Sequence, residues 1–148
     1  MTALALDLDR VVGDTRPLWR DWLEDAARRS RVDLTGLPED RAAAAEQLDG
    51  LVGNWRALLE RFAEDRAPVY LRPSAEVSGA LRRLAGDGVR LGAFTDAPRE
   101  LAEVAAAQLG ASRRLEALEA GAGALERLLA RLGPDARVLA DRAALLSL

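Results

Sequence analysis

Two aspartates, two positions apart, follow the first apolar run of the chain. The run 3–6 leads directly into Asp7, Leu8 and Asp9. A run that is apolar on both faces is typical of a buried strand in a parallel sheet, and open α/β sheets bind ligands beyond the carboxyl ends of such strands. In a regular strand, Asp7 and Asp9 would point to the same side. Two like charges so close need a cation or a proton to neutralise them.

Composition narrows the chemistry that these carboxylates could perform. The chain has no cysteine, no histidine and no lysine. Thiolate, imidazole and lysine chemistry are therefore excluded, and only carboxylates remain as metal ligands or general acids and bases. Ligation by oxygen alone favours a hard cation such as Mg²⁺.

Length and charge favour a single domain with a small ligand. The chain has 148 residues and a net charge of −3, without a basic block. This length allows one α/β core and a small insertion. The charge indicates neither nucleic acid nor an anionic membrane as a partner. No signal peptide and no apolar span of about 20 residues is present, so we expect a cytoplasmic protein.

The periodicity of apolar residues predicts strands that alternate with helices. After the first strand, Pro17 is expected in the first turn of a helix capped by Thr15 or Asp14. Further helices are expected at 39–49 and from Leu51 to Phe62, so that residues 14–71 form an all-helical insert. The α/β pattern then resumes at Pro73. Later strands are expected at 89–94, 114–118 and 138–140, and the helices between them imply parallel pairing.

The strand ends of this predicted sheet carry the candidate functional residues. They are Asp7 and Asp9 after the first strand, Thr95 and Asp96 after the second, and Asp141 after the last. Because parallel strands end at the same edge of a sheet, these side chains are expected to converge there.

The order of these segments resembles that of the haloacid dehalogenase-like (HAD) hydrolases. Asp7, Asp9, Val11, Val12, Asp14 and Thr15 fit the first motif of that family. The segment Gly86–Arg99, with its strand ending at Thr95, looks like the second motif, and Val138–Asp141 looks like the start of the fourth. The resemblance implies a three-layer Rossmann-like parallel sheet at 1–13 and 72–148. It also implies a helical cap of the C1 type at 14–71, inserted after the first strand.

The same resemblance implies roles for individual residues. Asp7 would be the nucleophile that takes the phosphoryl group, and Asp9 the general acid and base. Thr95, Asp96 and Arg10 would bind the phosphate. Asp7, Asp9 through its backbone carbonyl, and Asp141 would hold Mg²⁺. The implied function is Mg²⁺-dependent hydrolysis of a small phosphorylated metabolite.

Three positions depart from the family pattern. Arg10 stands where the first motif has glycine. The place of the third motif, Glu119–Gly123, has no cation, although Arg113, Arg114, Arg127 or Arg10 could supply one. After Asp141 the second acid of the fourth motif is missing, and Arg142 follows instead.

These departures leave two main functions open. One is the phosphatase, with impaired turnover. The other is a catalytically inactive HAD-like protein that acts as a binding or interaction module. A nucleotide-binding Rossmann or receiver-like domain is a weaker alternative, because no glycine-rich phosphate loop follows the first strand.

Overall fold

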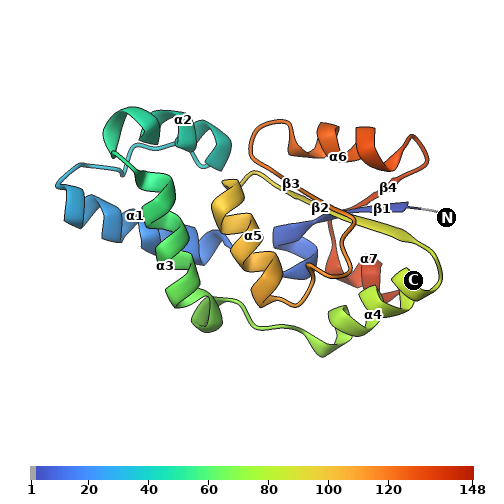
Figure 1. Ribbon diagram of the computed structural model, residues 1–148. Helices are drawn as coiled ribbons and strands as arrows, with labels where there is room; N and C mark the ends of the chain where they lie inside the picture. The colour runs from blue at the N-terminus through green and yellow to red at the C-terminus, as the bar shows by residue number, and fades with distance from the viewer. Residues whose placement is uncertain (1–2) are drawn as a thin grey trace.

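A four-stranded parallel sheet forms the centre of the computed structural model, which describes residues 3–148 (Figure 1). The strand order is β3-β2-β1-β4. β1 pairs with β2 so that Leu4 faces Leu91, and with β4 so that Leu4 faces Arg137. The strands span Ala3–Asp7 (β1), Arg90–Thr95 (β2), Ala117–Ala120 (β3) and Arg137–Leu139 (β4). The first strand of the chain is therefore interior, as its apolar run predicts.

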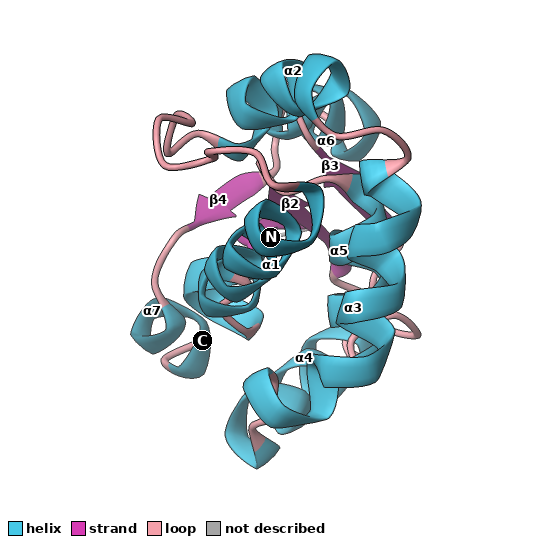
Figure 2. Ribbon diagram, turned by 90° about the vertical axis from the view of Figure 1, so that its left-hand side faces the viewer, coloured by secondary structure: helices cyan, strands magenta, loops and turns pink. Residues whose placement is uncertain are grey.

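Helices cover both faces of this sheet. α4 (Ala75–Gly86), α5 (Arg99–Gln108) and α7 (Arg142–Leu146) pack on the face that carries Leu4 and Leu6. α6 (Ala124–Leu132) packs on the opposite face, against Ala3 and Ala5. Figure 2 shows the sheet between α6 on one side and α4 and α7 on the other. The three-layer α/β architecture predicted from the sequence is confirmed.

Three further helices lie beside the sheet, between β1 and α4 in the chain. They are α1 (Arg16–Ser30), α2 (Arg41–Leu51) and α3 (Trp55–Tyr70). Their apolar faces form a second core around Trp19, Trp22 and Trp55, whose ring centroids lie 5.4–6.5 Å apart. α5 contributes Ala97 in its preceding loop and Leu101 to this second core. This arrangement is compatible with a cap, whose limits of 14–71 stay a prediction.

Some local expectations were wrong. β1 ends at Asp7, and a π-helical turn, η1 (Leu8–Val12), follows it. Asp9 therefore lies in a turn and not on the strand. The third strand forms at 117–120 and not at 114–118, and α2 continues through Gly50. No helix within residues 3–148 is long and apolar enough to cross a membrane.

Candidate active site

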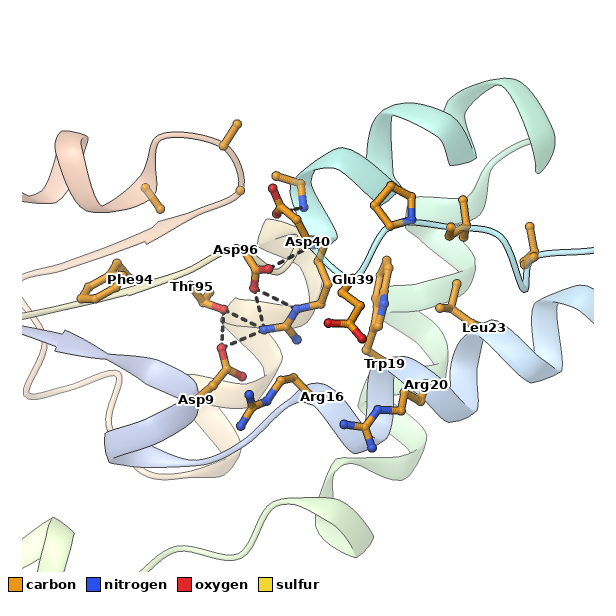
Figure 3. A pocket seen from close by; sticks show the side chains of 18 of the residues that line it. Asp9, Arg16, Trp19, Arg20, Leu23, Glu39, Asp40, Phe94, Thr95 and Asp96 are labelled. Carbon is orange, nitrogen blue, oxygen red and sulfur yellow. Dashed lines mark hydrogen bonds and ion pairs between the residues drawn. The ribbon is translucent and has the colours of Figure 1, made fainter. Parts of the chain in front are cut away.

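A cavity of about 1260 Å³ lies between the carboxyl edge of the sheet and the three helices beside it. The sheet side is formed by the turn after β1, the end of β2 and the loop before α6. The other side is formed by α1 and by the segment that leads into α2. Figure 3 shows Asp9, Thr95 and Asp96 turned toward one another where the two sides meet. The cavity lining includes Asp7, Asp9, Arg10, Thr95 and Asp96.

Asp7 is the last residue of β1 and faces this cavity. Its side chain is 21% exposed, and the nearest cation, the guanidinium Nε of Arg10, is 4.0 Å from its carboxylate. The backbone N–H of Arg10 donates to Asp7 at 3.3 Å. Burial raises the pKa of Asp7 above its ordinary value, and the charge of Asp9 acts in the same direction. Asp7 is thus a partly buried carboxylate without a close ion-pair partner.

Asp9 has the opposite environment, because both of its oxygens accept hydrogen bonds. Oδ1 accepts from the backbone N–H of Thr15 at 2.9 Å and from its hydroxyl at 2.5 Å. Oδ2 accepts from the Thr95 hydroxyl at 2.7 Å and from the Arg41 guanidinium at 2.8 Å. The Thr15 hydroxyl is therefore not a cap for α1. Asp14 accepts from the backbone N–H of Arg16 instead, at 3.0 Å.

Arg41 is the central residue of this network, and the sequence analysis did not select it. Its side chain is only 3% exposed. Its Nε donates to Asp96 Oδ1 at 2.9 Å, and its Nη2 lies 2.8 Å from the same oxygen in an ion pair. The guanidinium also donates to the hydroxyls of Thr15 and Thr95, at 2.6 and 3.3 Å. Nothing in the local pattern distinguishes Arg41 from the other arginines, because its partners lie 26 to 55 residues away in the chain.

Asp141 does not join the other predicted site residues. It is exposed, it caps α7 by accepting from the backbone N–H of Ala143 at 2.8 Å, and it does not line the cavity. The neighbouring Arg142 donates to the carbonyl oxygens of Val11 and Val12 at 2.9 and 3.0 Å. The expectation that Asp141 converges with the other strand ends is therefore wrong. β4 ends two residues before it, and the acid turns into its own helix.

The residues present do not fit the Mg²⁺ site that the resemblance implies. Within residues 3–148 no group of three acidic side chains is placed to hold a metal ion. Asp7, Asp9 and Asp141 are thus not assembled as a ligand set. Asp7 and Asp9 line the cavity, whereas Asp141 lies outside it.

The loop in place of the third motif is stabilised by arginines that turn away from the cavity. Glu119, at the end of β3, pairs with Arg127 at 2.9 Å and with Arg131 at 3.2 Å. Arg127 also donates to the carbonyl oxygens of Ala120, at 2.6 Å, and Ala122. The hydrogen bond from Arg127 lowers the pKa of Glu119. Neither Arg127 nor Arg113 and Arg114 lines the cavity, whereas Arg10 does.

Comparisons with known proteins support the fold. No protein-family model and no curated protein matches the chain. The chain is similar to the crystal structure of putative beta-phosphoglucomutase from Thermotoga maritima, with a TM-score of 0.57. The two are 20% identical, and the match covers 93% of this chain and 75% of the other. This likeness, together with the parallel sheet, shows that the chain shares the α/β fold of that protein.

Proposed function

We propose that the protein is a HAD-like phosphohydrolase that acts on a small phosphorylated compound bound in the cavity, with Asp7 as its nucleophile. The observation that carries this proposal is the position of Asp7 at the carboxyl end of an interior strand, facing the cavity without a close cation. The fold supports the same class of reaction, although a fold alone does not fix an activity.

The proposed reaction has two steps. A carboxylate oxygen of Asp7 attacks phosphorus, the bond from phosphorus to the ester oxygen breaks, and the leaving oxygen takes a proton. Water then hydrolyses the aspartyl-phosphate. The attack requires that negative charge on the phosphate be screened. Arg10, with a side chain 62% exposed beside Asp7, and the buried Arg41 are the cations placed to do so.

Asp9 is proposed as the acid and base, and this role requires a change in its contacts. Every hydrogen bond that Asp9 makes in this structure uses it as an acceptor, so no proton of its carboxyl group points at a leaving oxygen. Thr95 and Asp96, proposed to contact phosphate, are also engaged with Asp9 or Arg41. Separation of Asp9 from Arg41 must precede catalysis. A general acid–base contributes about 10²- to 10⁴-fold to a rate, so we expect slow turnover.

A second candidate function is a binding module without turnover. The engagement of Asp9 by Arg41 favours it, and so does the loop 119–123, whose arginine partners turn away from the cavity. In this case the cavity would hold a small phosphorylated ligand and leave it intact. Mg²⁺ has no step in either proposal, because the residues do not fit it.

The two functions are separated by hydrolysis of para-nitrophenyl phosphate, with Asp7→Asn as the test variant. The matched control is Asp141→Asn, which alters an exposed acid outside the cavity. We expect slow hydrolysis by the wild type, with or without a chelator. Asp141→Asn should retain this activity and Asp7→Asn should lose it.

Hydrolysis that survives in Asp7→Asn would contradict the assignment of the nucleophile. If no form hydrolyses the ester but inorganic phosphate raises the melting temperature of the wild type, the binding module is the better description.

A further inference from the structure

We infer that Arg41 is the built-in cation of this site: its guanidinium neutralises the clustered carboxylates and thereby prevents a divalent metal ion from binding among them. This inference concerns what the site holds, and it does not depend on whether the protein hydrolyses a phosphate.

The first support is the way in which Arg41 uses its donors. All three guanidinium nitrogens donate within the site: Nε to Asp96, Nη1 to the Thr15 hydroxyl, and Nη2 to Asp9 and the Thr95 hydroxyl. In Figure 3 the dashed lines meet at Asp9, Thr95 and Asp96. A guanidinium whose nitrogens are all satisfied by carboxylates and hydroxyls is a fixed part of the site.

The second support comes from the acceptor side. The two oxygens of Asp9 accept from Thr15, Thr95 and Arg41, and those of Asp96 accept from the backbone N–H and the side chain of Arg41. A hard cation needs such oxygens for itself. It could take them only by leaving a buried guanidinium without its partners, which is strongly unfavourable.

The third support is that Arg41 is anchored through its backbone. It is the first residue of α2, and its N–H donates to Asp96 Oδ2 at 3.0 Å. The preceding Asp40 caps the same helix. Ala44 and Leu48 fix the helix in the second core. Arg41 therefore leaves the site only if the start of α2 moves with it.

A second arginine occupies oxygens on the other side of the turn after β1. Arg142 donates to the carbonyl oxygens of Val11 and Val12, which are also ligands of the type that hard cations prefer. The carboxylates of Asp9 and Asp96 and these two backbone oxygens are thus all paired with arginines.

The test is thermal unfolding as a function of Mg²⁺ and Mn²⁺ concentration. The wild type should change its melting temperature by less than about 1 °C up to roughly 10 mM cation. Arg41→Ala, which frees Asp9 and Asp96, should gain a saturable rise of about 5 °C or more, as expected for a cation bound well below that concentration. Arg16→Ala is the matched control, because Arg16 also lines the cavity but pairs with the exposed Asp14. It should behave as the wild type does.

Two further measurements keep the inference falsifiable if Arg41→Ala does not fold. Arg41→Gln retains hydrogen-bond donors without the charge and should gain the same response to Mg²⁺; folded Arg41 variants that do not respond would overturn the inference. Saturable Mn²⁺ binding to the wild type by calorimetry, lost in Asp9→Asn, would overturn it as well. Neither result bears on the hydrolysis assay, so the two proposals fail separately.

Discussion

At the scale of single residues, two carboxylates two positions apart have different environments. Asp7 ends a strand, accepts from the backbone N–H of Arg10 and lies 4.0 Å from the Arg10 guanidinium. Asp9, displaced by the turn η1, is held by Thr15, Thr95 and Arg41. The same residue type is therefore suited to attack in one case and to anchor a network in the other. The chain separates the two roles by ending β1 between them.

We predict that Asp7→Asn makes the protein more stable at neutral pH. Because burial raises the pKa of Asp7 above its ordinary value of 3.8, the folded state favours the protonated form. Stability contributed by this group is greatest below that value and is lost as the pH rises through the raised pKa. The uncharged variant avoids this loss. We expect its melting temperature at pH 7 to rise by up to about 4 °C, and the gain to vanish below about pH 3.8.

Asp141→Asn is the control for this measurement, because asparagine also caps a helix and the site is exposed. Its melting temperature should stay within about 1 °C of the wild type. The prediction compares the melting temperature of Asp7→Asn with that of the wild type at each pH. A variant whose advantage is smaller at pH 7 than at pH 3.5 would contradict it.

We predict the opposite pH dependence for Glu119→Gln. The hydrogen bond from Arg127 lowers the pKa of Glu119, so its stabilising contribution is present above the ordinary value of 4.5 and is lost as the pH falls through the lowered pKa. At pH 7 the variant should lose about 0.5–1.5 kcal/mol, a modest amount because its arginine partners are half exposed. Chemical denaturation at pH 7 and below pH 4 measures the difference, which should shrink at acid pH. If the difference in unfolding free energy were the same at both pH values, the charge of Glu119 would not be its origin.

At the scale of elements, the two faces of β1 determine how closely helices approach. Its leucines face α4, α5 and α7, while its alanines face α6. The neighbouring Gly92 of β2 lies under α6, where an added Cβ would be 2.5 Å from Leu128 Cδ1. Small residues on this face therefore let α6 pack closely, and α6 is the helix that follows the loop at the cavity edge.

We predict that Gly92→Ala destabilises the fold by about 1–3 kcal/mol, because Leu128 must move out of its packed position. Gly79→Ala is the control. Gly79 lies inside α4, and an added Cβ there would meet only Arg82 Nη2, at 3.8 Å. Alanine should stabilise that helix by about 0.5–1 kcal/mol. Urea denaturation measures both changes. Equal effects at the two positions would mean that the packing of α6 on the sheet is not tight.

At the scale of the whole molecule, two apolar cores are joined into one unit. α5 belongs to the sheet layers, yet Ala97 and Leu101 pack into the second core with the tryptophans. Arg41 connects α2 to the ends of β1 and β2. An apolar and a polar connection thus join the helical part to the sheet, with the cavity lying between them.

We predict that the two cores unfold in a single transition. The three tryptophans all lie in the second core, so their fluorescence reports on that part, whereas far-ultraviolet circular dichroism reports on the whole chain. The two thermal midpoints should coincide within about 1 °C, as expected for one cooperative unit. A fluorescence midpoint several degrees below the midpoint measured by circular dichroism would show that the helical part unfolds on its own.

The sequence by itself determined the fold class and the nucleophile candidate. Apolar periodicity identified the buried first strand, the helices that alternate with later strands, and the helical stretch between them. These features depend on interactions between residues near one another in the chain, which is why a pattern of residue types is enough to predict them. The same pattern placed residues 7, 9, 95, 96 and 141 at one sheet edge, because parallel strands must end together, and all of them except residue 141 line the cavity there.

Only the tertiary structure decided which charges meet. The turn η1 moved Asp9 off the strand, the cap of α7 took Asp141 away from the cavity, and Arg41 paired with Asp9 and Asp96. The turn and the cap are local, but the contacts of Asp9 with Thr95 and Arg41 depend on where distant parts of the chain are packed. A side-chain pattern carries no information about a partner 26 to 86 residues away until the cores fix the distance between them.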